Sequence, residues 1–422
     1  MAIIISKRIV RLLILIIASF VFFGLLFSSS SSKFVDDKTV ENTKKILNDY
    51  IPDFIGSSLS SDDGTNDNEA AEMIEETITE VVDGDNVQAV IDDDVQIATN
   101  NKVKACFVSL VRNDDMWNIL DSVRGVEDRF NKKYQYPWIF LNDQEFSEDF
   151  KTTVSNVING EVKFGVIPEE HWSYPEWIDQ EKAAQTRIDM AKIIYGSSES
   201  YRHMCRFESG FFWRHPLLEE YDWYWRVEPD TKLYCDVDYD VFKWMQDNDK
   251  VYGFTISIHE YESTIKTLWA TTMKFVKEHP EYVAKDNMMN FISDDKGKTY
   301  NLCHFWSNFE IASLNFWRSD AYRAYFDYLD HAGGFFYERW GDAPVHSIAA
   351  ALFLPRDKVH FFEGIGYYHP PYHNCPIDIN VWTENKCGCD RGQDFTFQGY
   401  SCGNKYFEAN NMEKPEGWEA FD

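Results

Sequence analysis

The sequence of 422 residues lacks the glycine-rich phosphate-binding motifs of the commonest nucleotide-binding proteins. No Gly-x-Gly-x-x-Gly follows its first apolar strand pattern, and a Walker lysine motif is absent. A dinucleotide-binding fold and a P-loop nucleotide site are therefore disfavoured. The sequence also has no Asn-x-Ser/Thr site, so we do not expect N-glycosylation of this chain.

Positive charge is scarce. The chain has 41 Lys and Arg against 70 Asp and Glu, a formal net charge of −29, which argues against nucleic acid or an anionic membrane surface as a partner. About half of this excess lies between residues 28 and 100, where eighteen Asp and Glu face four Lys and aromatic residues are almost absent. Such a composition cannot bury enough apolar surface to fold, so we expect residues 31–100 to form an acidic, flexible stem.

Long apolar runs are rare, and one stands near the start. Leu12 to Phe27 is uncharged and follows Lys7, Arg8 and Arg11. Its sixteen residues fall slightly short of the ~20 that span a bilayer. A cleaved signal peptide is the alternative, although its apolar core is usually ~7–15 residues and no clear Ala-x-Ala site follows here. We favour an uncleaved anchor at residues 12–30, with residues 1–11 cytosolic and the remainder lumenal.

Cysteine is absent from the first hundred residues, and all eight cysteines follow them. An even number in an oxidising compartment favours disulfides. Cys387-Gly-Cys389 lacks the usual spacing of zinc ligands. Cys106 and Cys235 lie in or next to expected core strands, so either could be a free buried thiol.

Residues 101–422 are rich in aromatics and alternate between strand and helix patterns. Strands are expected at residues 103–111, 138–141 and 162–167, with helical periodicity from Met116 to Phe130, within 146–158 and over 179–195. This alternation predicts an α/β fold in which a mixed, mostly parallel sheet is flanked by helices.

The segment Tyr221 to Phe242 is the strongest candidate for a functional site. Its aromatic and β-branched start predicts a buried strand, which must stop at Glu228-Pro229-Asp230 because proline cannot donate to a sheet ladder. Carboxylates at the end of a strand suit a Mg²⁺ or Mn²⁺ ion whose other ligands come from a substrate diphosphate. Two solvated acids at a strand end are the simpler alternative.

Several longer segments carry a family resemblance. They are Ser200 to Phe207, Tyr224 to Asp230, Tyr234 to Asp240, Tyr300 to Ile311, Glu338 to His346 and His369 to Pro376. Together they resemble the fungal Golgi α-1,2-mannosyltransferases of the KTR type, glycosyltransferase family 15, from Lys102 to the C-terminus.

The resemblance implies a GT-A-like, Rossmann-like catalytic domain with a donor-binding half at about 101–250 and an acceptor half at about 251–422. It also implies a single-pass type II protein of the Golgi membrane. The implied reaction transfers mannose, with retention, from GDP-mannose to mannose-terminated O-linked or N-linked glycans of cell-wall and secreted glycoproteins, with Mn²⁺ as cofactor.

The resemblance also assigns residues to roles. Glu228 and His369 would bind the metal, with His373 as a rival for His369. Asp230, Arg112 and Tyr201 would contact the donor.

Two acids are implied in the chemistry. Glu310 would lie by the anomeric carbon, as a nucleophile in a double displacement or as a stabiliser of an oxocarbenium-like cation. The alternative for Glu310 is a buried acid tied to a neighbour such as Arg318. Asp342 would bind or deprotonate the acceptor, and Ala343-Pro344 after it predicts a helix start.

Two rival functions share these features. A mannosylphosphate transferase of the same family would use the same donor and metal site. A non-catalytic lumenal glycan-binding protein could keep the fold, but the intact Glu-Pro-Asp, Asn-Phe-Glu and His-Pro-Pro segments count against it.

Overall fold

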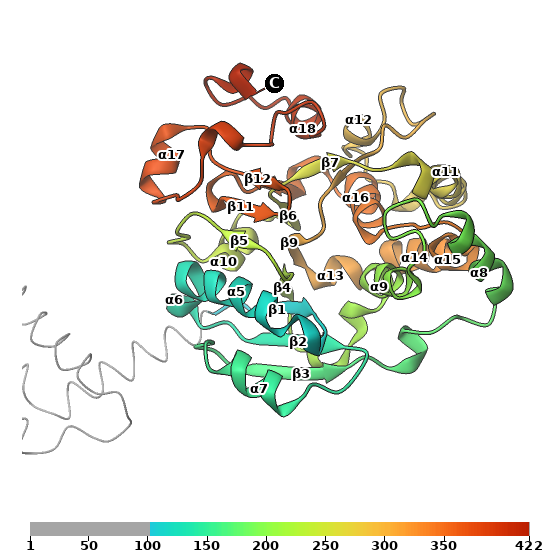
Figure 1. Cartoon of the computed structure of the whole chain (residues 1–422). Coiled ribbons are helices and arrows are strands. Elements are labelled where there is room, and N and C mark those ends of the chain that lie inside the picture. The colour runs from blue at the N-terminus through green and yellow to red at the C-terminus, as the bar shows by residue number, and fades with distance from the viewer. Residues whose placement is uncertain (1–101, 422) are drawn as a thin grey trace, which may run out of the picture. The chain divides into compact units, whose positions relative to one another are not determined.

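The computed structural model describes residues 102–421 of the chain (Figure 1). The expected cytosolic tail, anchor and stem lie outside these residues. Within the described part, no helix combines the length and apolarity needed to cross a membrane.

A seven-stranded sheet forms the centre of the fold, in the order β10-β6-β9-β4-β1-β2-β3. Strands β4, β1, β2 and β3 are parallel, and β9 runs antiparallel to both β4 and β6. The sheet is therefore mixed and mostly parallel, as the sequence predicts. Its strands are β1 (Ala105–Leu110), β2 (Trp138–Asn142), β3 (Val162–Val166), β4 (Trp223–Val227), β6 (Tyr252–Phe254), β9 (Phe309–Ser313) and β10 (Val359–Phe361).

Helices cover both faces of this sheet, because successive strand residues point to opposite sides and both sides are apolar. On one face lie α5 (Met116–Val126), α6 (Lys132–Tyr134), α7 (Glu148–Ser155) and α10 (Val241–Asp247). The other face carries α9 (Glu199–Gly210), α11 (Leu268–Glu278), α13 (Leu314–Trp317), α14 (Asp320–Ala332), α15 (Gly334–Tyr337) and α16 (Asp342–Phe353).

Aromatic rings fill much of the core. Phe107 stacks on Trp138 with ring centroids 4.5 Å apart, and Trp225 of the neighbouring strand lies 5.5 Å from Phe107. Burying a side chain of the size of Phe contributes up to about 3 kcal/mol. This packing fixes β4 at the middle of the sheet.

The four parallel strands end at the same edge of the sheet, called the carboxyl edge below. Because β9 is antiparallel to β4, it begins at this edge, with Phe309 opposite Val227 and Glu310 opposite Arg226. A small sheet lies here too, formed by β12 (Tyr372–Asn374), β11 (Tyr367–His369) and β5 (Lys232–Leu233). Strand β5 begins two residues after Glu228-Pro229-Asp230. Segments far apart in the sequence therefore meet where β4 stops (Figure 1).

The disulfide prediction is confirmed within the described residues. Three bridges form: Cys235–Cys387, Cys303–Cys402 and Cys375–Cys389. Cys106 is a free buried thiol, as expected for one of the two candidates. Cys235 is not free, because it lies next to the C-terminal segment and is bonded to Cys387. Cys205 is the second free buried thiol.

One helix is shorter than expected. The pattern over residues 179–195 yields α8 (Gln180–Asp189), whose N-terminus is capped by the Asp179 side chain. The chain then turns back on itself, and a Cβ at Gly196 would lie 1.9 Å from the Met190 carbonyl oxygen. Within α8, Ala183 is buried but Ile188 is exposed, so the apolar residues of this segment do not all mark a buried helix face.

Candidate active site

Arg226 of β4 lies at the centre of a group of acids. Strand alternation places it on the same face as Glu228, two residues further along. Its guanidinium is buried and pairs with Glu228 Oε1, lies 2.7 Å from Asp342 Oδ2 and lies 3.7 Å from Glu208 Oε2. Burial by itself would lower the pKa of Arg226, but these carboxylates outweigh it and raise the pKa. One fixed positive charge therefore contacts three acids, which come from the end of β4, from α9 and from α16.

Asp342 reaches this group from the first turn of α16. Its Oδ2 accepts hydrogen bonds from Arg226 and from the Ser307 hydroxyl, each at 2.7 Å. Burial opposes ionisation of Asp342, yet the positive charge of Arg226 and the contact with Ser307 prevail and lower its pKa. The helix begins here as expected, with Pro344 inside its first turn.

His369 faces Glu228 across the carboxyl edge. The antiparallel pairing of β11 with β5 sets this position, because β5 follows the Glu-Pro-Asp turn. His369 Nε2 lies 3.7 Å from Glu228 Oε2, and both side chains are about one-quarter exposed. Nδ1 is 3.1 Å from the carbonyl oxygen of Pro370, which can only accept, so Nδ1 carries the hydrogen in a neutral ring. The lone pair of Nε2 then points toward a carboxylate.

This pair fits a divalent cation. Two electron-pair donors that face each other need a proton or a cation between them, and ligands held at about 2 Å from one ion lie roughly 3–4 Å apart. Imidazole nitrogen and carboxylate oxygen suit Mn²⁺, and an Nδ1–H bonded to a backbone carbonyl is typical of a metal-binding histidine. Burial would raise the pKa of Glu228, but the positive charge of Arg226 outweighs burial and lowers it, so the carboxylate is ionised.

His373 does not share this arrangement. It lies on β12, where its ring stacks with Tyr234 and packs against Tyr368 at centroid distances of 5.7 and 4.6 Å. The geometry thus separates the two histidines, and His369 is the one beside Glu228.

Glu310 lies deeper, one residue inside the sheet from the start of β9. It is fully buried, and its carboxylate accepts hydrogen bonds from the hydroxyls of Tyr224 at 2.7 Å and Tyr252 at 2.8 Å. His346 Nδ1 lies 2.8 Å from the same group. Arg318, the partner considered from the sequence, instead donates to backbone carbonyls of Tyr221 and Leu218.

The three expected donor contacts lie at different places along the carboxyl edge. Arg112 is exposed after β1 and donates to the Ser200 hydroxyl at the start of α9. Tyr201 is the next residue, stacked on Tyr195 with centroids 4.5 Å apart and approached by Arg339 at 5.2 Å. Asp230 is exposed with a φ of 63°, and its Oδ2 accepts from Asn118 at 3.2 Å. Arg112 therefore contacts the residue that precedes Tyr201, while Asp230 is exposed to solvent.

Sequence reasoning missed the residues that connect these groups: Glu208, Tyr224, Arg226, Tyr252, Ser307 and His346. Arg226 did leave a signal, because a lone charge in an apolar strand must be paired. His346 left another, since it follows Asp342 by four residues and shares its helix face. Glu208 left none, because its partners come from distant segments.

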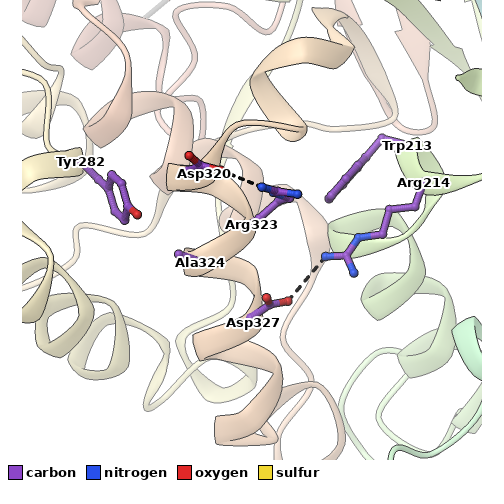
Figure 2. Close-up of a pocket in the computed structure, with 7 residues that line it drawn as sticks. All are labelled: Trp213, Arg214, Tyr282, Asp320, Arg323, Ala324 and Asp327. Carbon is purple, nitrogen blue, oxygen red and sulfur yellow. Dashed lines mark hydrogen bonds and ion pairs between the residues drawn. The ribbon is translucent and has the colours of Figure 1, made fainter. Parts of the chain in front are cut away.

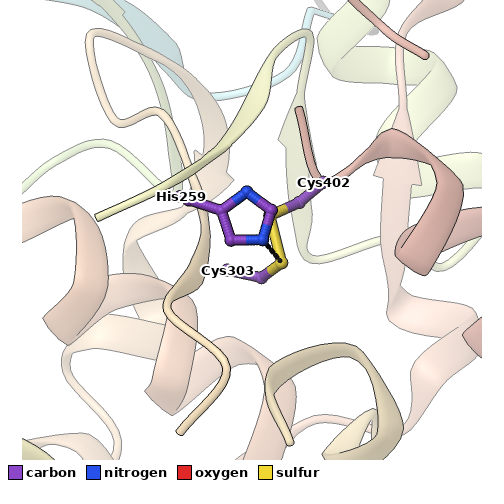
Figure 3. A group of neighbouring side chains, drawn as sticks. All are labelled: His259, Cys303 and Cys402. Atoms are coloured by element: carbon purple, nitrogen blue, oxygen red, sulfur yellow. Dashed lines mark hydrogen bonds between the residues drawn. A yellow bond between two sulfur atoms is a disulfide. The ribbon is translucent and has the colours of Figure 1, made fainter. Parts of the chain in front are cut away.

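A cluster of one histidine and two cysteines does not form a rival metal site. His259, Cys303 and Cys402 meet closely, but Figure 3 shows the two sulfurs joined in a disulfide, so neither is a free thiolate ligand.

A surface pocket of about 540 Å³ contains Trp213, Arg214 and Arg323 (Figure 2). Its guanidinium groups are already paired, Arg214 with Asp327 at 3.5 Å and Arg323 with Asp320 at 2.7 Å. None of the expected site residues lines this pocket.

Comparisons with known proteins identify the family. The family model described as Glycolipid 2-alpha-mannosyltransferase matches residues 61–411. The chain is 68% identical over 321 residues to a Glycolipid 2-alpha-mannosyltransferase of Saccharomyces cerevisiae, covering 76% of this chain and 73% of that protein. It is 62% identical over 323 residues to the Alpha-1,2 mannosyltransferase KTR1 of the same yeast, covering 76% and 82%.

A solved structure is similar as well. The crystal structure of Core-mannan synthase A from Aspergillus fumigatus, in its Mn/GDP form, superposes with a TM-score of 0.70 at 42% identity. The match covers 74% of this chain and 87% of that one. The chain therefore belongs to the glycolipid 2-alpha-mannosyltransferase family, the fungal KTR-type glycosyltransferases of family 15.

Proposed function

We propose that this protein is a GT-A-like, retaining α-1,2-mannosyltransferase. It transfers mannose from GDP-mannose to the 2-hydroxyl of a terminal mannose on O-linked or N-linked glycans of cell-wall and secreted glycoproteins. The observation that carries the proposal is the opposed pair of Glu228 and His369 at the carboxyl edge, where open α/β sheets bind ligands. Relatives named as α-1,2-mannosyltransferases and a related structure with Mn and GDP support it.

Glu228 and His369 would hold Mn²⁺. When bound, the ion supplies positive charge for the departing GDP. Arg226 contacts two ionised carboxylates, Glu228 and Asp342, so these residues alone leave an excess of negative charge at this edge. Tyr201, in the first turn of α9, would contact the diphosphate, and Arg112, which donates to the neighbouring Ser200, would contact the nucleotide.

Asp342 would bind the acceptor. Because its pKa is lowered, its carboxylate is ionised at neutral pH and accepts hydrogen bonds from sugar hydroxyls well. Glu310 would stabilise positive charge at the anomeric carbon from beneath. Its burial and its hydrogen bonds from two tyrosines favour this electrostatic role over the nucleophilic one.

We also propose a type II orientation in the Golgi membrane, with the catalytic domain in the lumen. The basic residues before the apolar run support it, and three disulfides suit an oxidising compartment. Carbonate extraction of intact vesicles should leave the protein in the membrane, and protease should digest the domain only after detergent is added. Digestion without detergent would place the domain on the cytosolic side.

The decisive functional experiment compares Glu228→Ala with the wild type in an assay with GDP-mannose, Mn²⁺ and an α-mannoside. The variant should lose transfer while remaining folded, because the metal loses its only carboxylate from the chain in this arrangement. Asp247→Asn, an exposed acid paired with Lys243 on α10, is the matched control and should keep full activity.

Wild-type turnover by Glu228→Ala would refute the metal assignment. Linkage analysis of the wild-type product then tests the reaction. An α-1,2-linked dimannoside supports the proposal, whereas a phosphodiester would select the mannosylphosphate transferase.

A further inference from the structure

His346 lies on α16 one turn after Asp342, in the layer beneath the proposed acceptor site. It is fully buried, and its ring stacks on Trp317 with centroids 4.3 Å apart and an interplanar angle of 28°. The ring therefore has one orientation. None of the roles considered so far uses this side chain.

Both ring nitrogens of His346 face hydrogen-bond acceptors. Nε2 lies 3.1 Å from the backbone carbonyl oxygen of Glu208, which can only accept, so Nε2 carries a hydrogen. Nδ1 lies 2.8 Å from Glu310 Oε1. A neutral ring with its hydrogen on Nε2 would set the Nδ1 lone pair against a carboxylate, so this contact requires one more proton, shared between the ring and Glu310.

The other partners of Glu310 show where this proton belongs. Trp317 Nε1 donates to the Tyr224 hydroxyl oxygen at 3.1 Å, so the Tyr224 hydrogen is free for Glu310. Tyr252 donates to the other side of the carboxylate. With two phenols donating, Glu310 is stabilised as the anion, and the proton lies on His346.

We propose that His346, as an imidazolium, is the positioning residue that holds Glu310 ionised and in the single orientation needed beneath the anomeric centre. This inference rests on the proposed function, since it assigns to Glu310 the charge stabilisation described above. A buried carboxylate with no cationic partner would instead take up a proton itself and lose that charge.

The charges around the ring agree with this assignment. Burial alone would lower the pKa of His346, but Glu310 and Asp342 outweigh burial and the opposing charge of Arg226, so the pKa is raised. The groups that face the pair from the neighbouring elements are Glu310 of β9, Asp342 of α16, Arg226 and Tyr224 of β4, Tyr252 of β6, Tyr322 of α14 and the Glu208 carbonyl of α9.

Two substitutions separate the two contacts of the ring. The amide of Asn occupies the place of Nδ1, so His346→Asn keeps a neutral donor to Glu310. The amide of Gln reaches the place of Nε2. His346→Gln therefore keeps the hydrogen bond to the Glu208 carbonyl and loses the hydrogen bond to Glu310. If His346 had only a structural role, the loss of kcat in each variant would follow its loss of thermal stability.

The test measures kcat, KM for GDP-mannose, GDP affinity and thermal midpoint for both variants and for Glu310→Gln. We expect His346→Gln to lose at least 100-fold in kcat and His346→Asn about 10-fold, with GDP affinity unchanged in both. In the wild type, kcat should fall at alkaline pH as the pair loses its proton, and His346→Asn should lack this fall. Glu310→Gln should lose several orders of magnitude in kcat.

Failure of this inference differs from failure of the proposed function. If Glu310→Gln is inactive but both His346 variants keep wild-type kcat and pH profile, the positioning role is wrong and the proposed function stands. Equal losses of kcat in the two His346 variants, with a pH profile like that of the wild type, would likewise overturn the positioning role of His346. Near-normal kcat in Glu310→Gln would remove Glu310 from the chemistry, and the role of His346 with it.

Discussion

Arg226 is the residue on which the charge balance of the site depends. Its guanidinium contacts Glu228 and Asp342 directly and lies 3.7 Å from the third acid, Glu208. Because Glu208 is buried and more distant from Arg226, it is the acid that is least stabilised as an anion. Burial raises the pKa of Glu208 to about 7, and the negative charges of Asp342 and Glu228 add to this.

The raised pKa of Glu208 predicts a pH dependence of stability. Between the ordinary pKa of a glutamic acid and about 7, the folded protein binds a proton that the unfolded chain does not, so the free energy of unfolding should fall as pH rises through this range. The full effect of this group is roughly 3 kcal/mol. Glu208→Gln cannot ionise and should show a flatter profile.

Denaturant unfolding of the metal-free protein at several pH values measures this difference. The stability of the variant relative to the wild type should increase from about pH 4.5 to pH 7. A difference that stays constant with pH would show that Glu208 ionises normally in the folded state.

At the scale of elements, the β11–β12 hairpin carries His369, the proposed second metal ligand. Its pairing with β5 places His369 beside Glu228, whereas His373 packs against Tyr234 and Tyr368. The two histidines therefore form a matched pair for substitution. We expect His369→Ala to weaken Mn²⁺ binding by ~100-fold or more, and His373→Ala to leave it within a few-fold of the wild type.

Titration calorimetry with Mn²⁺ in the presence of GDP measures both affinities. The reverse order of effects would assign the metal to His373. Equal, small effects would mean that neither histidine is a ligand.

These elements also show what the sequence could and could not predict. Strand β4 and its stop at Pro229 were readable, because aromatic residues and a proline report local structure directly. The start of α16 was readable for the same reason. The pairing of β5 with β11 was not, since both strands are very short and their contact depends on distant segments. Glu228 and His369 could therefore be named by resemblance, but their approach to within 3.7 Å could not be derived from the sequence.

The hydrogen-bond partners of Glu310 could not be predicted from the sequence either. Glu310 was recognised as an acid among aromatics, but its partners Tyr224, Tyr252 and His346 lie on three other elements. A tyrosine in a strand is usually a packing residue, and nothing local marks the two that donate to a carboxylate.

At the scale of the whole molecule, two disulfides join the C-terminal segment to earlier parts of the chain, Cys235–Cys387 and Cys303–Cys402. Cys235 lies two residues after β5 and is bonded to Cys387, which closes a loop across 152 residues, whereas Cys375–Cys389 spans 14. In the chain-entropy view, the longer loop contributes about 5 kcal/mol and the shorter about 3 kcal/mol. The Cys235–Cys387 bridge also holds the chain just after β5, the strand that pairs with β11 of the His369 hairpin.

Paired serine substitutions test this ranking. Cys235→Ser with Cys387→Ser should lower the free energy of unfolding more than Cys375→Ser with Cys389→Ser, and should also weaken Mn²⁺ binding. Chemical denaturation and metal titration give the two readouts. A larger loss from the short bridge would show that local strain, rather than loop closure, decides the stability.

The most direct test of the account is to locate manganese in crystals of the protein grown with GDP and Mn²⁺. Anomalous diffraction at the manganese edge identifies the ion without reference to its surroundings. We predict one strong peak about 2 Å from a carboxylate oxygen of Glu228 and from Nε2 of His369. A peak away from Glu228, or no ion bound with the nucleotide in place, would contradict the assignment of this edge as the donor site.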